Sequence, residues 1–285
     1  MFTYHFFQLT TQSYTHVGQG AADSGVIDNL IQREKPYDIP VMHASSLKGA
    51  FREHCKCILD YPDVTLNYLF GSGESESAGP NAKTSARKVY QAIVNIHDAR
   101  LLMLPVGALF GKSFYYATSN FVLSRYNKIL KQLTGKELVH NLPLPSENER
   151  FFCLHSNPPQ LNPLIEGIQG NYKLYQGNSI PNKILSTPIE SIAIFHDDLF
   201  VSLCRNCIPI IERNKLDEGG ISENKFNEEV LPYDTKFWFF VSFPTSLKDD
   251  TIIKTFIEDI KKSYVQIGAN YSLGQGLCEI SEITP

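Results

Sequence analysis

Short apolar runs near both ends of the chain predict most of its regular structure. Residues 2–10, FTYHFFQLT, are rich in aromatic side chains and predict a first strand. The run FWFFVSF at 237–243 is apolar almost throughout and predicts a central strand. Apolar residues recur at helical spacing over 247–264, which predicts an amphipathic helix. Residues 265–280 are typical of a strand, a glycine loop and a final strand.

Another helix is predicted over about 46–59, with Ser45 or Ser46 as its N-cap. Its inner side is apolar apart from one histidine: Ala50, Phe51, His54, Ile58 and Leu59. Basic residues recur at every fourth position and share an outer stripe: Lys48, Arg52 and Lys56. The helix therefore has one face for a core and one face for solvent or a ligand.

The middle of the chain is less regular. Residues 89–104 predict a strand pair or one long bent strand, and residues 105–130 predict a loop followed by a helix. Residues 191–214 predict a strand and then a helix. The small, polar residues of 71–88 predict a surface loop insertion. Residues 141–188, rich in Pro, Asn and Gly, suggest little regular structure.

Without the insertions the element order is β-α-β, then β-α-β. This order predicts an α+β fold in which helices cover one face of an antiparallel sheet, the ferredoxin-like or RNA-recognition-motif-like arrangement. Residues 216–234 are polar, with Gly219 and Gly220 near their start, and predict a projecting hairpin. We expect residues 1–285 to form a single domain with one large core or two coupled subdomains.

Composition and charge narrow the class of protein. The 285 residues are 42% hydrophobic and 20% charged, which is ordinary for a globular protein. The net charge of -4 argues against a free-standing, non-specific nucleic-acid binder, although a local basic groove is compatible with it. The N-terminus lacks the pattern of a signal peptide and no run is long enough for a membrane span, so we expect a cytoplasmic protein with no membrane partner.

The six cysteines do not suggest a disulfide framework in a chain of this length. Cys204 and Cys207 have C-x-x-C spacing, but a structural zinc site needs four ligands. We therefore interpret both as core or partly buried thiols.

Candidate chemistry lies in a glycine-rich stretch, HVGQGAADSGVIDN, at residues 16–29. Such a stretch is typical of a surface loop on a rigid scaffold. Asp28 and Asp23 are each compatible with a turn-forming role. Beside a nucleic-acid backbone, either carboxylate is equally compatible with recruiting a divalent metal or assisting a proton transfer.

Two further segments are compatible with phosphate binding. The SSLKG sequence places Ser45, Ser46 and Lys48 at a helix start, where amide groups, the helix dipole and a cation coincide; a plain N-cap with a solvated lysine explains it as well. The loop GANYSLGQG at 268–276 could present backbone N–H groups to phosphate, or it could be a tight turn with no ligand.

Together these segments resemble the RAMP superfamily of CRISPR proteins, and within it the backbone-subunit family of the type III-B Cmr effector complex, its fourth subunit. The resemblance runs from about His16 to Glu279 and favours the Cmr branch over its type III-A sibling. It rests on an ordered set of sequences: HVGQG, GVIDN with IQRE, SSLKGAFR, HDARLLMLPV and QIGANYSLGQGL.

The resemblance implies a ferredoxin-like palm with a protruding β-hairpin thumb at about 212–230. Copies of such a subunit polymerise head to tail along a guide crRNA, together with other Cmr subunits, and the thumb splays out nucleotides at regular intervals. Target RNA pairs with the guide and is cut beside each splayed position by a metal-dependent endoribonuclease. The ribose 2′-hydroxyl is the implied nucleophile, Mg²⁺ or Mn²⁺ the implied metal and a cyclic phosphate the implied product.

The resemblance also assigns residues. The catalytic, metal-binding aspartate falls on Asp28, while Asp23 lies where the family has small residues. Glu228 and Glu229 fall at the thumb base as possible support. Contacts to RNA are implied for one set of residues: His16, Ser45, Ser46, Lys48, Arg52, Gly268, Gly274 and Gly276.

This sequence departs from the family pattern at three places, which affect local backbone geometry but leave Asp28 and Lys48 in position: Gln19, His43 with Ala44, and Ala269. Two alternatives stay open. One is a guide-RNA-binding scaffold without catalysis, and the other is a metal-dependent hydrolase of small molecules that uses Asp23 and Asp28.

Overall fold

The computed structural model describes residues 1–20, 27–72, 90–137, 142–146, 148–174, 183–216, 219–220 and 222–284. Asp23 and most of the predicted loop insertion at 71–88 lie outside the described residues.

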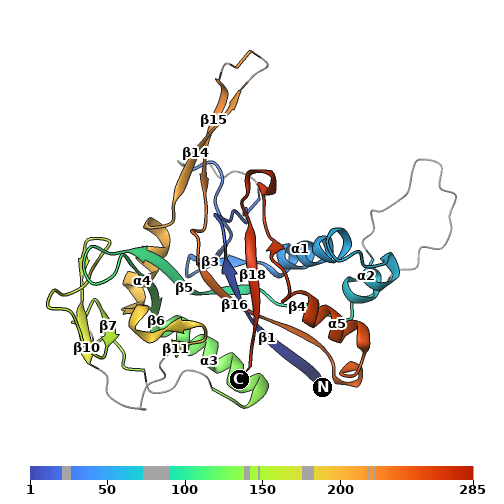
Figure 1. The fold of residues 1–285 in the computed structure, drawn as a ribbon, viewed down its shortest axis with the longest axis horizontal. Helices are drawn as coiled ribbons and strands as arrows, with labels where there is room; N and C mark the ends of the chain where they lie inside the picture. The colour runs from blue at the N-terminus through green and yellow to red at the C-terminus, as the bar shows by residue number, and fades with distance from the viewer. Residues whose placement is uncertain are drawn as a thin grey trace.

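A four-stranded antiparallel core confirms the ferredoxin-like arrangement. Its strands, in chain order, are β1 (Phe2–Thr11), β5 (Ala99–Gly107), β16 (Lys236–Pro244) and β18 (Leu277–Ile283). They lie in the order β5-β16-β1-β18, with every neighbouring pair antiparallel. Helices α1 (Ala44–Cys57) and α5 (Thr251–Asp259) make the two crossovers (Figure 1). The predicted element order therefore gave the correct topology.

Helices cover both faces of this sheet, rather than the single face expected. On one face Phe51 of α1 lies against Phe239, with ring centroids 5.8 Å apart, and Phe256 of α5 packs beside it. On the other face Trp238 meets Tyr126 of α3 (Asn120–Thr134) at 5.2 Å. Because adjacent residues of a strand point to opposite faces, the continuous apolar run of β16 serves two layers of helices.

Strand β5 extends past β16 and joins the core to a second group of strands. Its C-terminal half pairs with β6 (Phe114–Ser119), and the sheet continues through β13 (Ile192–Phe195), β7 (Phe151–His155) and β10 (Asn171–Leu174). The strand and helix predicted at 191–214 are confirmed as β13 and α4 (Asp197–Asn206). The sequence did not predict β6, β7 or β10, because β6 follows a loop-like glycine sequence, and β7 and β10 lie in the region rich in Pro, Asn and Gly.

The remaining elements are short: β2 (Arg33–Glu34), β3 (Ile39–Met42), α2 (Asp63–Phe70), β4 (Asn95–Ile96), β8 (Leu164–Ile165), β9 (Ile168–Gln169), β11 (Lys183–Ile184), β12 (Thr187–Pro188), η2 (Ile189–Ser191), η3 (Thr245–Leu247), β17 (Val265–Gln266) and η4 (Tyr271–Leu273). Among the described residues, no helix has the length and apolarity needed to cross a membrane.

The predicted hairpin projects far from the body of the molecule (Figure 1). It consists of β14 (Ile210–Leu216) and β15 (Ser222–Glu229), which form a two-stranded sheet of their own. We call it the thumb. An isolated two-stranded hairpin is only marginally stable in water, so its position depends on how its base is held.

Helix α1 begins differently from the prediction. Its N-cap is His43 rather than Ser45 or Ser46, and Asp98 accepts a hydrogen bond from the amide of Ala44 (2.8 Å) through Oδ1. A carboxylate from another segment thus satisfies the first amide of the helix, which leaves the two serines inside the first turn. The helix also ends at Cys57, so Ile58 is 68% exposed and lies outside the core face predicted for it.

The two C-x-x-C thiols lie where core thiols are expected. Cys204 is buried in α4, and Cys207 is half-buried just beyond it. Burial raises the pKa of Cys207 to about 11, so this thiol stays protonated at neutral pH.

Arg52 holds helix α2 rather than pointing freely into solvent. Its guanidinium donates to the carbonyl oxygens of Leu66 (3.2 Å) and Gly71 (2.9 Å) and to Oδ1 of Asn67 (3.0 Å). The C-terminal carbonyls of a helix lack partners within the helix, and a cation there also complements the helix dipole. Arg52 therefore fixes α2 against α1.

We predict that Arg52→Ala lowers the free energy of unfolding by about 2 kcal/mol, because hydrogen bonds to a charged donor are lost. Urea unfolding checks this. Lys56→Ala on the same helix is the matched control, since Lys56 is exposed, and its effect should stay within about 0.5 kcal/mol. Equal stability of the two variants would contradict the role assigned to Arg52.

Candidate functional site

Asp28 lies against the base of the thumb. Its loop runs alongside β15, where Asn29 donates to the carbonyl oxygen of Asn227 (3.1 Å) and accepts from the amide of Glu229 (2.9 Å). The Asp28 carboxylate itself accepts a hydrogen bond from the Asn227 amide (2.8 Å) through Oδ2. The side chain is otherwise exposed. One carboxylate is thereby fixed at the surface beside residues 227–229, which we call the thumb root.

Glu228, in the thumb root, is buried among polar partners. Its carboxylate pairs with Arg213 of β14 (2.8 Å), and both of its oxygens accept from Nδ2 of Asn270 (3.1 and 3.0 Å). Nε2 of His16 lies 3.6 Å from Oε1 of Glu228, and Nδ1 of His16 donates to the carbonyl oxygen of Glu229 (2.7 Å). Both nitrogens of His16 therefore face protein groups. The network joins three segments that are distant in the sequence.

Glu229 is equally buried and has its own arginine. Arg33 forms an ion pair with its carboxylate, and the amide of Ile31 donates to it (3.2 Å). Arg33 also donates to the carbonyl oxygens of Asp38 and Cys204, each at 2.9 Å. Because a buried charge is costly unless it is paired, these contacts strongly favour a single placement of the thumb root. Glu229 thus anchors the base of the thumb to the body of the molecule.

The glycine loop between β17 and β18 closes on residues 14–18. At Gly268, where φ is +90°, a Cβ atom would lie 2.2 Å from the carbonyl oxygen of His16, so only glycine fits. The Gly276 amide donates to the backbone carbonyl oxygen of Tyr14 (2.8 Å), and the Gly274 amide donates to that of Tyr271 (2.9 Å). These two amides are used within the protein, so they do not form the phosphate cradle that the glycine spacing suggested.

The first turn of α1 faces a groove that also contains the glycine loop. The groove has a volume of about 740 Å³, and its lining includes Ser46, Gly18 and Gly268. Ser45 is exposed on this turn and Lys48 is partly exposed. The structure therefore brings Ser46 and Gly268 to one surface feature, and it places Ser45 and Lys48 on the same turn as Ser46. Arg52 is engaged with α2.

Several residues of the site escaped the sequence analysis. Nε2 of Gln32 donates to the carbonyl oxygen of Gly18 and to the hydroxyl of Ser46, each at 3.0 Å. Oε1 of Gln32 accepts from the backbone amide of His43 (2.7 Å). Asn270 adopts a left-handed backbone (φ 65°), and its side chain reaches Glu228. Both lie inside the IQRE and GANYSLGQG sequences, so the sequence indicates where these residues lie but not which groups they contact.

The described residues do not form a metal centre by themselves. No group of three or more His, Cys, Asp or Glu side chains within them is arranged to hold a metal ion. Glu228 and Glu229 are committed to buried ion pairs, which leaves Asp28 as the exposed carboxylate at the thumb root. The described residues thus do not fit a metal ion held by protein ligands alone.

Comparison with known proteins gives consistent results. The chain is 28% identical over 295 residues to the CRISPR system Cmr endoribonuclease Cmr4 of Pyrococcus furiosus, covering 96% of this chain and 93% of that protein. The crystal structure of oligomeric Cmr4 from the same organism superposes with a TM-score of 0.72 at 23% identity, covering 99% of each chain. A chain of the type III-B Cmr-beta complex bound to cognate target RNA gives a TM-score of 0.73 at 16% identity, covering 98% of this chain and 97% of that one.

A family model covers most of the chain as well. The model of the RAMP superfamily matches residues 8–279, which include strands β5 and β16, parts of β1 and β18, the thumb and the glycine loop. The fold agrees with this assignment, because the antiparallel core has ferredoxin-like order and carries a projecting hairpin. The chain therefore belongs to the RAMP superfamily.

Proposed function

We propose that this chain is the backbone subunit of a type III-B CRISPR effector complex in the cytoplasm, and that it cuts target RNA paired to a guide crRNA. The single observation that carries this proposal is Asp28, an exposed carboxylate fixed beside the root of a projecting thumb. The relative from Pyrococcus furiosus is a Cmr endoribonuclease, and structural neighbours occur as oligomers and in Cmr-beta complexes. These parallels support head-to-tail copies of this chain that assemble together with other Cmr subunits.

Guide binding is assigned to the first turn of α1 and the neighbouring groove. Lys48 has no ionic partner among the described residues and is partly exposed, so its ammonium group is available to phosphate. Ser45 adds a hydroxyl on the same turn. These groups do not distinguish bases, so sequence specificity comes from pairing between guide and target. Electrostatic binding of this kind weakens as salt increases.

Cutting is assigned to Asp28 acting on a strand that the thumb distorts. The 2′-oxygen of the ribose attacks the adjacent phosphorus and the bond from phosphorus to the 5′-oxygen breaks. The 2′-hydroxyl releases its proton to water and the leaving 5′-oxygen takes up a proton from water, so the products are a cyclic phosphate and a strand with a free 5′-hydroxyl. An aspartate is a weak base for a hydroxyl, so Asp28 orients the 2′-hydroxyl rather than fully deprotonating it. Most of the rate comes from in-line placement of the reacting atoms.

The proposed dependence on Mg²⁺ or Mn²⁺ requires ligands from outside the described residues. Mg²⁺ is commonly held by one or two carboxylates together with phosphate oxygens and water. Asp28 offers one carboxylate, so RNA would have to supply most of the other ligands. The mechanism above therefore assigns no step to a metal ion.

Two alternatives make different predictions. A non-catalytic scaffold is favoured by one observation, namely that no second exposed carboxylate adjoins Asp28 among the described parts of the thumb root. A small-molecule hydrolase that uses Asp23 and Asp28 gains no support, because Asp23 lies outside the described residues. The Asp28 variant below separates the scaffold from the nuclease.

We predict that Asp28→Asn reduces target cutting at least about 100-fold, because a neutral amide orients the 2′-hydroxyl poorly. Guide binding and assembly should be unchanged. Cleavage of a labelled target in the assembled complex measures this. Asp60→Asn, an exposed carboxylate elsewhere, is the control. Unchanged cutting by Asp28→Asn would favour the scaffold.

We predict that Lys48→Ala weakens guide binding several-fold and reduces the slope of log affinity against log salt by about 0.7, as expected for one lost phosphate contact to a single strand. Titration of labelled RNA at several salt concentrations tests it. Lys56→Ala removes a cation further along α1 and should change the slope less. Equal slopes for the wild type and Lys48→Ala would exclude this contact.

We predict that Glu229→Gln lowers the free energy of unfolding by about 3 kcal/mol, because it leaves Arg33 buried without a counter-charge. Target cutting should fall more than guide binding, since the Asp28 loop is bonded to the same strand. Adding Arg33→Met should restore part of the stability. Urea unfolding and cleavage assays together check both points, and a fully stable Glu229→Gln would refute the assignment.

A further inference from the structure

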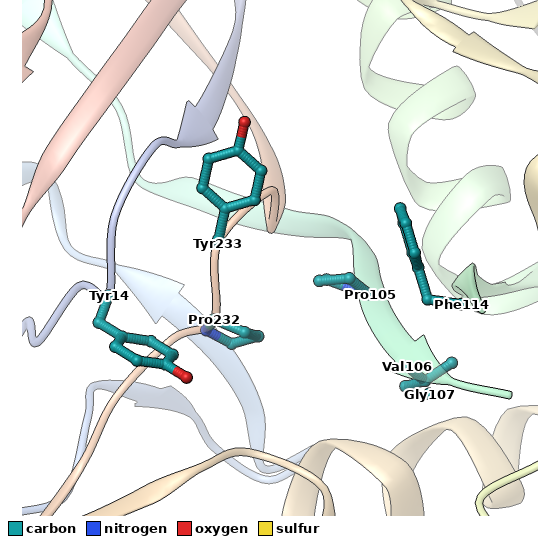
Figure 2. A pocket seen from close by; sticks show the side chains of 7 residues that line it. All are labelled: Tyr14, Pro105, Val106, Gly107, Phe114, Pro232 and Tyr233. Carbon is teal, nitrogen blue, oxygen red and sulfur yellow. The ribbon is translucent and has the colours of Figure 1, made fainter.

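An uncharged aromatic hollow lies beside the thumb root, and none of its lining residues is assigned a role in the proposed function. Its volume is about 250 Å³. Figure 2 shows Tyr14, Pro232 and Tyr233 on one side and Phe114 on the other, with Pro105 between them. Val106 and Gly107 complete the lining. Such a volume is smaller than usual pockets for drug-sized ligands, so the hollow suits one small flat group.

Three aromatic rings of this hollow are unusually exposed. Tyr14 is 46% exposed, Phe114 is 43% and Tyr233 is 57%. Large aromatic side chains usually bury most of their surface, and aromatic rings gathered around one concavity mark a binding surface.

The backbone that carries these rings is firmly held. Thr15 and Leu231 exchange two hydrogen bonds, at 3.0 and 2.9 Å, and the carbonyl oxygen of Tyr14 accepts from Gly276 (2.8 Å). The carbonyl oxygen of Pro232 accepts from the hydroxyls of Thr11 (2.7 Å) and Thr235 (2.8 Å). The rings therefore sit on a rigid support, which reduces the entropy cost of binding.

The hollow continues the proposed RNA site. It shares two chain segments with the thumb-root network, because Tyr14 precedes His16 and Pro232 follows Glu229, while its other side comes from β5 and β6. From Glu229 to Pro232 is three residues of extended chain, a distance of about 10 Å. A nucleotide displaced at the thumb root could place its base there.

The structure assigns this hollow to the base of an unpaired RNA nucleotide, stacked on Tyr14 and Tyr233 without choice of sequence; this rests on the proposed function. None of the lining residues carries a charge, so the hollow suits a base and not a phosphate. Aromatic stacking accepts every base, because each has a flat π-face. Tyrosine hydroxyls at the rim can also bond to base edges.

The test uses RNA that carries a single 2-aminopurine, whose fluorescence falls when it stacks. One arm places the probe at successive positions of the guide strand, and the other places it in the paired target. Each is bound to wild-type protein and to the double variant Tyr14→Ala with Tyr233→Ala. The double variant Tyr14→Phe with Tyr233→Phe keeps the rings, and Phe2→Ala removes an exposed aromatic at the far end of β1 as a control.

We expect quenching at regularly spaced positions in one arm, which identifies the strand. The alanine variant should lose this quenching and about tenfold in RNA affinity, while the phenylalanine and Phe2→Ala variants keep both. If the alanine variant binds RNA normally and its quenching is unchanged, the assignment of the hollow to a base is wrong, while the proposed function stands. Loss of self-association without any change in quenching would overturn it in favour of a contact between copies. Failure of the wild type to bind RNA would overturn the proposed function as well.

Discussion

The placement of the site depends on two buried carboxylates at the base of a hairpin that cannot hold its own position. β14 and β15 form a separate two-stranded sheet, which is marginal on its own in water. Glu228 and Glu229 connect it to the body through His16, Asn270 and Arg33, while Arg213 pairs with Glu228 within the thumb. Because breaking a buried pair leaves an uncompensated charge, one arrangement of the thumb is strongly favoured. The fold uses this constraint to aim an element that is otherwise exposed and polar.

The same arrangement supports the functional role proposed for Asp28. Asp28 is not buried, and it belongs to no cluster of metal ligands among the described residues. What distinguishes it is its position, because the backbone amide and the backbone carbonyl of the next residue, Asn29, are both hydrogen-bonded to the thumb root. In the proposed mechanism its chemistry comes from the geometry of the bound strand, and the hollow nearby is proposed to take a base that is turned outwards.

The sequence predicted the parts that depend on local pattern. The apolar run of β16, the amphipathic spacing of α5 and the polar hairpin with its two glycines each appear where expected. Contacts between distant segments could not be predicted in this way. Asp98 caps α1 in place of a serine, Arg52 turns to α2, and Gln32 joins Gly18 to Ser46. The location of the site was therefore predictable from its sequences and from the family resemblance, whereas the partner of each side chain depends on the tertiary fold.

A density map of the assembled complex tests the central claim most directly. Loaded with guide RNA and an intact target, the Asp28→Asn variant should hold the side chain of residue 28 within about 3 Å of one ribose 2′-hydroxyl, beside a nucleotide that the thumb has displaced. A map that shows residue 28 far from every distorted sugar–phosphate linkage, with the thumb in place, would contradict the account.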